Sequence, residues 1–196
     1  MPEKRSAVPS EILQIKVTLL GTSPPIWRRL LVPADLTLAK LHQILQVAVG
    51  WHDSHPHGFS VGPRHFRIPD PDDELDGLPP AEGERTARLS RVLDVVGSKA
   101  IYIYDFGDNW EHSVVLEKRL PADPNLTYPI CTDGQLACPP EDCGGVPGFY
   151  NLVEALADPT HEEHKEMLRW LGKKFDPQAF SVDRVNQVLV LTRRRK

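Results

Sequence analysis

The chain has 196 residues, 40% of them hydrophobic and 26% charged, which is the composition of a globular protein and excludes collagen-like, coiled-coil and disordered classes. The formal net charge of -4 gives no support for nucleic-acid binding by the chain as a whole. No hydrophobic run reaches the roughly 20 residues that span a bilayer, and the start of the chain lacks a signal-peptide core, so we expect a cytoplasmic protein without a membrane partner.

The domain organisation is predicted to be simple. We expect one domain over residues 12–192, because a chain of this length can bury a large core without disulfides or metals. Residues 1–11 are predicted to be a flexible tail and residues 193–196 a basic tail. Two proline-rich stretches interrupt the domain: an acidic loop over 69–84, expected on the surface, and a Pro/Gly/Cys segment over 121–148 that shows no periodicity.

The first elements in chain order are two strands and a helix. Alternating hydrophobic residues over 13–19 predict a strand with one buried face. After a Gly/Pro-rich break, residues 26–32 predict a second strand that forms a hairpin with the first. Hydrophobic residues at helical spacing then predict a helix from Leu38, with Thr37 as its cap and Gly50 as its end.

The middle of the chain predicts two more hairpins and a helix. Residues 58–61 form an extended stretch that can pair with 65–68, and hydrophobic residues over 89–96 recur at helical spacing. Strands over 100–106 and 111–120 flank the turn sequence Gly-Asp-Asn, which is the strongest hairpin signal in the chain.

The C-terminal part predicts helices. A short helix is expected over 151–157, a second one with Asp158 as its cap and Leu168 on its hydrophobic face, and a third from near Ser181. The order of elements predicts an α+β fold: a mixed or mostly antiparallel sheet with helices packed on one side and a C-terminal helical annex.

The first candidate site is a cluster of three cysteines, Cys131, Cys138 and Cys143. A clustered, odd number of cysteines favours reduced thiols or metal ligands over disulfides. Zn²⁺ prefers four sulfur or nitrogen ligands, so zinc is a candidate cofactor if a histidine completes the set. The spacing lacks the paired CxxC motif, and three half-buried thiols are the alternative interpretation. The candidates for the fourth ligand are His55, His57 and His112.

A second polar segment follows the first predicted helix and contains Trp51, His52, Asp53, His55 and His57. In an extended segment His55 and His57 point to the same side, where imidazole groups could bind a divalent metal. Polar residues that end a helix and lie in a loop are the alternative explanation.

A third polar segment lies at the turn of the strongest hairpin and contains Asp105, Asp108, Trp110 and His112. Carboxylates, an indole and an imidazole at one turn could bind a ligand or transfer protons. Turn formation by Asp108 and core packing by Trp110 explain the same residues without a ligand. The sequence contains no phosphate-binding loop, serine-hydrolase elbow or His-Glu-x-x-His motif.

Together these segments resemble the plasmid pRiA4b Orf3-like family. The motifs that carry the resemblance are Ile15-Lys16-Val17-Thr18-Leu19 with Pro25-Ile26-Trp27-Arg28-Arg29, Gly50-Trp51 through His55-Pro56-His57, Tyr104 through His112, and Cys138-Pro139-Pro140-Glu141-Asp142-Cys143-Gly144-Gly145 with Gly148. The resemblance covers residues 12–190. It implies a largely uncharacterised family whose members are often encoded on plasmids and mobile elements, and it supplies no established catalytic residue.

We therefore expect a binding or accessory module with a protein or small-molecule partner, and we assign no catalytic residue. Two alternatives stay open: a metal-dependent hydrolase or nuclease that uses a His/Asp site, and a module with a structural zinc site at the cysteines. The leading hypothesis requires the three polar segments, which are far apart in the chain, to meet on one surface.

Overall fold

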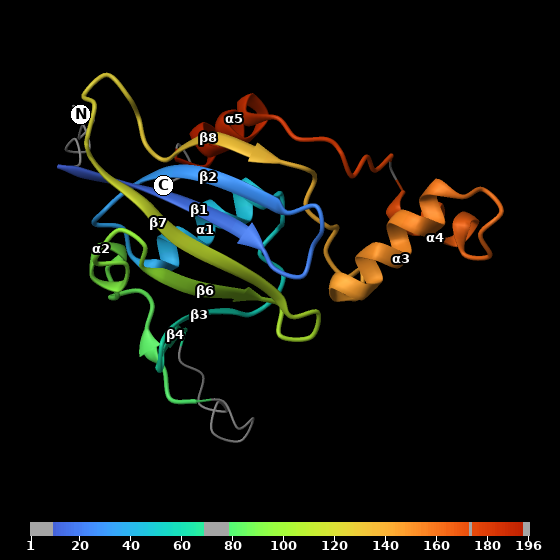
Figure 1. Cartoon of the computed structure of the whole chain (residues 1–196), viewed down its shortest axis with the longest axis horizontal. Coiled ribbons are helices and arrows are strands. Elements are labelled where there is room, and N and C mark those ends of the chain that lie inside the picture. The colour runs from blue at the N-terminus through green and yellow to red at the C-terminus, as the bar shows by residue number, and fades with distance from the viewer. Residues whose placement is uncertain (1–9, 69–78, 173, 194–196) are drawn as a thin grey trace, which may run out of the picture.

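A computed structural model describes residues 10–68, 79–172 and 174–193 (Figure 1). The tails predicted over 1–11 and 193–196 lie mostly outside these residues, as does most of the acidic loop.

The strands are β1 (Glu11–Leu19), β2 (Ile26–Pro33), β3 (His57–Val61), β4 (Arg64–Arg67), β5 (Glu82–Gly83), β6 (Lys99–Tyr104), β7 (Trp110–Pro121) and β8 (Ile130–Gln135). They form one sheet in the order β5-β4-β3-β6-β7-β1-β2-β8. All neighbours are antiparallel except β4 and β5, which are parallel. This mixed sheet confirms the predicted α+β fold.

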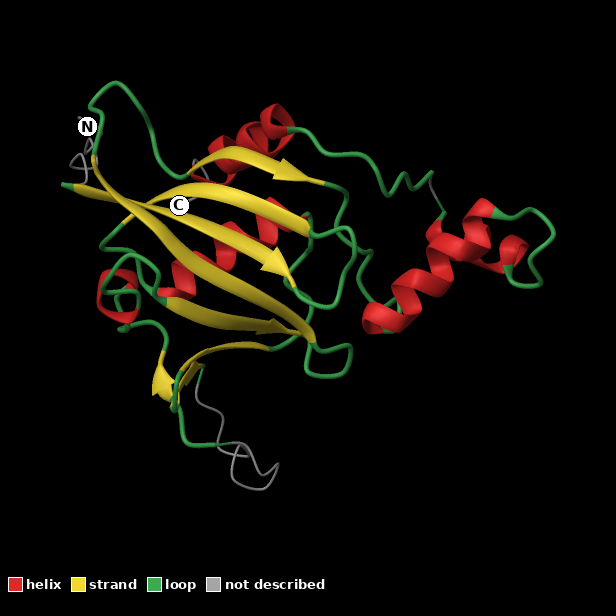
Figure 2. Ribbon diagram, viewed as in Figure 1, coloured by secondary structure: helices red, strands yellow, loops and turns green. Residues whose placement is uncertain are grey.

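The helices are α1 (Leu38–Val49), α2 (Leu89–Val92), α3 (Gly145–Ala157), α4 (His164–Leu171) and α5 (Val182–Arg193). Figure 2 shows α1 lying across one face of the sheet, while α3 and α4 project beyond one end of it. Helix α5 returns to pack against α1 and β8. The predicted C-terminal annex is therefore divided between a projecting pair of helices and one helix that joins the core.

The first hairpin and helix follow from their sequence patterns. Strands β1 and β2 pair antiparallel, and the alternating hydrophobic residues of β1 are buried in the core with those of α1. The Thr37 hydroxyl accepts a hydrogen bond from the Lys40 N–H at the start of α1. Gly50, with φ of 90°, ends the helix in the left-handed conformation that glycine adopts without strain. These predictions are confirmed.

Strand β8 lies inside the Pro/Gly/Cys segment, where no periodicity predicted it. Its residues include Asp133 and Gly134 and do not alternate, so neighbours rather than composition make it a strand. Strand β2 pairs with one side of β8. On the other side the Asn186 side chain of α5 accepts from the Cys131 N–H and donates to the Cys131 carbonyl, both at 2.8 Å.

Three predicted helix boundaries were wrong. Helix α2 ends at Val92, because Val95 and Val96 are 61% and 59% exposed and form no buried face. Helix α3 begins at Gly145 rather than at residue 151, because its first turn includes glycines that the sequence pattern treats as breakers. Asp158 ends α3 instead of capping the next helix, which begins at His164.

Candidate functional site at one end of the sheet

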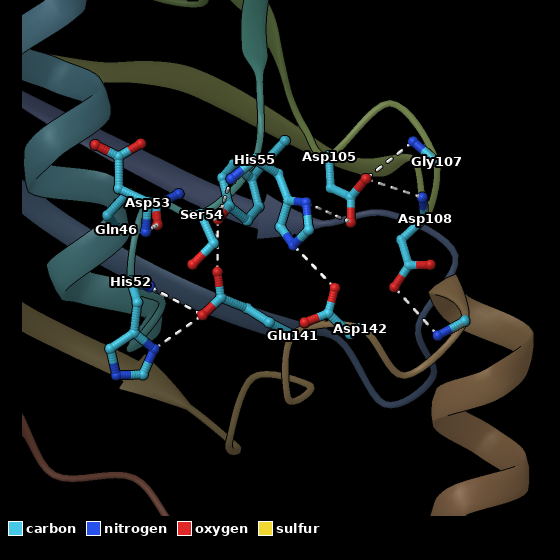
Figure 3. A network of polar contacts seen from close by, with 12 residues as sticks. Gln46, His52, Asp53, Ser54, His55, Asp105, Gly107, Asp108, Glu141 and Asp142 are labelled. Atoms are coloured by element: carbon cyan, nitrogen blue, oxygen red, sulfur yellow. Dashed lines mark hydrogen bonds and ion pairs between the residues drawn. The ribbon is translucent and has the colours of Figure 1, made fainter.

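Three polar segments meet at the end of the sheet where β6 and β3 adjoin the end of α1 (Figure 3). The α1–β3 loop contacts the loop before α3, because His52 Nδ1 lies 2.8 Å from Glu141 Oε2. The β6–β7 turn contacts the start of α3, where the Gly144 N–H donates to Asp108 Oδ2 at 3.1 Å. Residues 51–57, 104–112 and 139–145 thus adjoin one another at this end of the sheet, and we call them together the sheet-end site.

The sheet-end site is acidic. Its three segments contain six carboxylates and no lysine or arginine. The carboxylates are Asp53, Asp105, Asp108, Glu111, Glu141 and Asp142. A surface lined by charges of one sign attracts ligands of the opposite sign and repels phosphate groups. The site therefore favours a cationic ligand.

Tyr104 joins all three segments from the end of β6. Its hydroxyl donates to Glu141 Oε1 at 2.5 Å and accepts from the backbone N–H groups of Ser54 and His55 at 2.8 and 3.3 Å. Burial, followed by the hydrogen bond to Glu141, raises the pKa of Tyr104 above its ordinary value. The hydroxyl therefore stays protonated and works as a fixed structural donor.

Trp51 lies under this network rather than on the surface. It is 7% exposed, its ring stacks on Tyr104 with centroids 4.9 Å apart, and its indole N–H donates to the Pro139 carbonyl at 2.8 Å. Burial of both rings holds the loop before α3 against the end of the sheet.

His55 lies between two carboxylates, as Figure 3 shows. Its Nε2 atom is 2.9 Å from Asp142 Oδ1, and its Nδ1 atom is 3.7 Å from Asp105 Oδ2. The other oxygen of Asp105 accepts from the backbone N–H groups of Gly107 and Asp108 at 2.9 and 3.3 Å, which fixes that carboxylate. One imidazole and two carboxylates with ligand atoms within 4.8 Å of one another form a candidate metal site.

The backbone places three aspartates of the sheet-end site in an unusual conformation. Asp53, Asp105 and Asp142 have φ of 59°, 57° and 61°, in the left-handed region that few residues other than glycine adopt. Aspartate tolerates this region better than most residues because its side chain can bond to nearby backbone. Such strain costs on the order of 1 kcal/mol each and is common at functional sites.

A buried pair of histidines lies next to this site. The rings of His42 and His57 stack with centroids 3.4 Å apart. His42 Nε2 lies 2.7 Å from Asp53 Oδ1, and His57 Nε2 lies 2.9 Å from Glu84 Oε2. Glu84 is 2% exposed, so the prediction that residues 69–84 are a surface loop was wrong at Glu84. A buried carboxylate needs a partner, and His57 supplies one.

A chain of hydrogen bonds sets the protonation of His42. The Asp53 N–H donates to Gln46 Oε1, so the Gln46 amide nitrogen donates to the Tyr102 hydroxyl at 3.0 Å. The Tyr102 proton then points to His42 Nδ1 at 2.9 Å, which leaves Nε2–H to donate to Asp53. Burial, then the neighbouring His57, lowers the pKa of His42, in agreement with a neutral ring. His42, Asp53 and His57 also bring ligand atoms within 4.8 Å, but this tautomer of His42 has no lone pair left for a metal.

Two predicted binding residues lie in the core rather than on the surface of the site. Trp110 is 0% and His112 is 1% exposed. His112 Nδ1 donates to the Trp110 carbonyl at 3.1 Å, and burial lowers the pKa of His112 to about 4. The structure therefore separates these two side chains from His52, His55 and Asp108, which it brings together.

The three cysteines are free thiols, and only Cys143 belongs to the sheet-end site. Cys131 is buried in β8, and Cys138 Sγ accepts from the buried guanidinium of Arg28 at 3.3 Å. Burial raises the pKa of all three thiols, that of Cys143 to about 12. Among the described residues, the groups of three His, Cys, Asp or Glu whose ligand atoms all lie within 4.8 Å contain no cysteine. Zinc at the cysteines stays a prediction.

Sequence reasoning missed several residues of the sheet-end site and of the buried histidine pair beside it. The missed residues are His42, Glu84, Tyr104, Glu141 and Asp142. Tyr104, Glu141 and Asp142 lie within the segments that were singled out, so motif membership was a usable signal for them. His42 is in a hydrophobic helix and Glu84 in an acidic loop, and neither context indicates a site.

Comparisons with known proteins agree on one relationship. A family model described as plasmid pRiA4b ORF-3-like protein matches residues 11–184. The uncharacterised protein y4hQ of Sinorhizobium fredii (strain NBRC 101917 / NGR234) is 38% identical over 181 residues, which cover 92% of this chain and 91% of y4hQ. The crystal structure of MM3350, a protein of unknown function from Methanosarcina mazei Go1, matches with a TM-score of 0.80 and 36% identity over 89% of this chain and 97% of that one. Within the described residues, every helix is too short or too polar to cross a membrane.

Proposed function

The chain belongs to the plasmid pRiA4b ORF-3-like family, and we propose that it is a binding or accessory module whose sheet-end site takes a cationic ligand. The observation that carries the proposal is the convergence of four carboxylates with His52 and His55, from three segments that are far apart in the chain and contain no lysine or arginine. The four carboxylates are Asp105, Asp108, Glu141 and Asp142. A location in the cytoplasm and carriage on mobile elements remain predictions from the sequence.

The site is suited to binding because three of its carboxylates are already held by hydrogen bonds. Backbone N–H groups hold Asp105 and Asp108, and the Tyr104 hydroxyl holds Glu141. A ligand then loses little affinity to the ordering of side chains. The acidic surface also argues against direct contact with a nucleic-acid backbone.

A metal-dependent hydrolase or nuclease is the second candidate function. The arrangement of His55 between Asp105 and Asp142 favours it, because imidazole and carboxylate groups hold catalytic divalent ions in many hydrolases. Binding is preferred because the acidic site disfavours a phosphodiester substrate. A module with a structural zinc at Cys131, Cys138 and Cys143 has less support, because the groups of described residues whose ligand atoms lie close enough to share an ion contain no cysteine.

The proposal is tested by amide NMR of the full chain during separate titrations with MnCl₂, spermidine and a lysine-rich peptide. We expect at least one of these cations to perturb signals of residues 51–57, 104–112 and 139–145 selectively. The variant Glu141→Gln should weaken the effect, while Glu166→Gln, which removes an exposed carboxylate on α4, should not. The absence of a selective effect with all three cations would refute the proposal.

A further inference from the structure

We propose that the cationic ligand of the sheet-end site is a divalent transition-metal ion, held by His55, Asp105 and Asp142. This inference rests on the proposed function and names its ligand. Three observations support it: the direction of the contact between His55 and Asp142, the groups that face the two nitrogens of His55, and the complete hydrogen bonding of His42 in the neighbouring cluster.

The contact between His55 and Asp142 has the distance of a hydrogen bond but not its direction. His55 Nε2 is buried and makes no aligned hydrogen bond, although it lies 2.9 Å from Asp142 Oδ1. Two ligand atoms that each lie about 2.1 Å from one metal ion at a right angle are about 3 Å apart and point to the ion, not to each other. The observed separation and misalignment match that arrangement.

The partners of the His55 ring also leave a place for a cation. Both nitrogens face carboxylates, Nδ1 toward Asp105 and Nε2 toward Asp142. A neutral imidazole has a lone pair on one nitrogen, and this lone pair would repel a facing carboxylate. A metal ion at that nitrogen removes the repulsion and balances the two carboxylates. A second proton on the ring is the competing explanation, and the experiment below separates the two.

The neighbouring cluster of His42, Asp53 and His57 is the weaker candidate for a metal. His42 uses both nitrogens, accepting from Tyr102 and donating to Asp53. Its hydrogen bonds are complete without an ion, whereas His55 Nε2 has no aligned partner. The ion is therefore assigned to His55 rather than to the buried pair.

The donor set indicates the class of metal. One imidazole and two carboxylates suit Mn²⁺, Fe²⁺, Co²⁺ or Zn²⁺ better than Mg²⁺ or Ca²⁺, which prefer oxygen ligands alone. Mn²⁺ is the best probe because it binds thiolates weakly, so the cysteines do not compete for it.

The test is a calorimetric titration of the full chain with MnCl₂ at pH 7, repeated with MgCl₂. We expect one Mn²⁺ site per chain, with weaker or unmeasurable binding of Mg²⁺. The variant Asp142→Asn should reduce Mn²⁺ affinity about tenfold or more. Because the Asp142 side chain is 65% exposed, this variant is expected to fold, and a thermal melt checks it. A second variant, Asp53→Asn, tests the neighbouring cluster of His42 and His57, and the matched control Glu166→Gln, which removes an exposed carboxylate on α4, should keep the affinity.

The possible results separate this inference from the proposed function. Loss of Mn²⁺ binding in Asp142→Asn but not in Asp53→Asn supports the metal site. Loss in Asp53→Asn alone places the ion at the buried histidines and overturns the assignment. If Mn²⁺ does not bind while spermidine or the lysine-rich peptide still perturbs the sheet-end site, the metal inference fails and the proposed function stands. If no cation acts on the site, both fail.

Discussion

The imidazole rings of His42 and His57 lie face to face, with centroids 3.4 Å apart and planes within 1° of parallel. Two protonated rings at this distance would repel each other in a buried environment, so at least one ring is neutral. The Tyr102 hydroxyl determines that His42 is the neutral ring, because it donates to His42 Nδ1 and leaves that nitrogen without a proton.

Removal of the Tyr102 hydroxyl should therefore destabilise the fold. In Tyr102→Phe the buried His42 Nδ1 and the Gln46 amide lose their shared partner, and we expect a loss of about 1–3 kcal/mol. Urea unfolding followed by fluorescence measures it. The control Tyr150→Phe, at a residue that is 40% exposed, should cost less than about 1 kcal/mol. Equal effects of the two variants would contradict the hydrogen-bond chain.

Stability should fall as the pH is lowered from 6.5 toward 4, in part because of His112. In this range the unfolded chain protonates His112, while the folded protein keeps it neutral because its pKa is lowered to about 4. The unfolded state thus binds more protons, and the difference amounts to about 3 kcal/mol across the window.

The measurement is urea unfolding at several pH values between 4 and 7.5. The variant His112→Gln should have a shallower dependence on pH than the wild type, whatever its stability at pH 7. The control Tyr150→Phe removes no group that titrates in this pH range and should keep the slope of the wild type. An unchanged slope in His112→Gln would show that burial does not hold this ring neutral.

Tyr104 should control the order of the loop before α3. In Tyr104→Phe, Glu141 loses the donor that fixes it, and the N–H groups of Ser54 and His55 lose their acceptor. We expect amide hydrogen exchange in residues 52–56 and 139–145 to become about tenfold faster, which corresponds to about 1.4 kcal/mol. Mass spectrometry of peptides measures the exchange. Tyr128→Phe, a change in the β7–β8 loop, should leave these peptides unaffected.

Gly148 should not tolerate a side chain. A Cβ atom at this position would overlap the carbonyl oxygen of Cys143, which is backbone and cannot rotate away. We expect Gly148→Ala to lower stability by about 1–3 kcal/mol and to reduce cation binding at the adjacent sheet-end site. In the control Gly83→Ala the new Cβ atom would lie 3.8 Å from its nearest neighbour, which is an ordinary contact. This variant should behave like the wild type in a thermal melt. A wild-type melting temperature for Gly148→Ala would exclude the close approach.

The fold could be predicted where hydrophobic spacing reflects burial. Hydrophobic and polar residues alternate along β1 and β7, and hydrophobic residues recur at helical spacing between Thr37 and Gly50 in α1. These patterns predicted the elements because each element buries one face in the core. Strand β8 could not be predicted, since its partners on β2 and at Asn186 are supplied by the tertiary structure. The start of α3 was missed because Gly144 and Gly145, both at positive φ, suit a loop as well as a helix start.

The candidate site could be predicted only in pieces. Each polar segment was visible from its own residues, but their convergence depends on contacts such as Tyr104 with Glu141, which join distant parts of the chain. His112 and Trp110 share a strand with Glu111, and alternation along β7 turns them into the core. Residue type alone does not show which of these neighbours faces solvent.

The pairing of Asn186 with Cys131 has a consequence for how copies of this protein meet. A side-chain amide from α5 takes the hydrogen-bonding groups that the outermost strand would otherwise offer to a strand of another molecule. The last helix thereby occupies one pairing position in the middle of the edge strand, and an incoming strand would have to displace Asn186 before it could pair there.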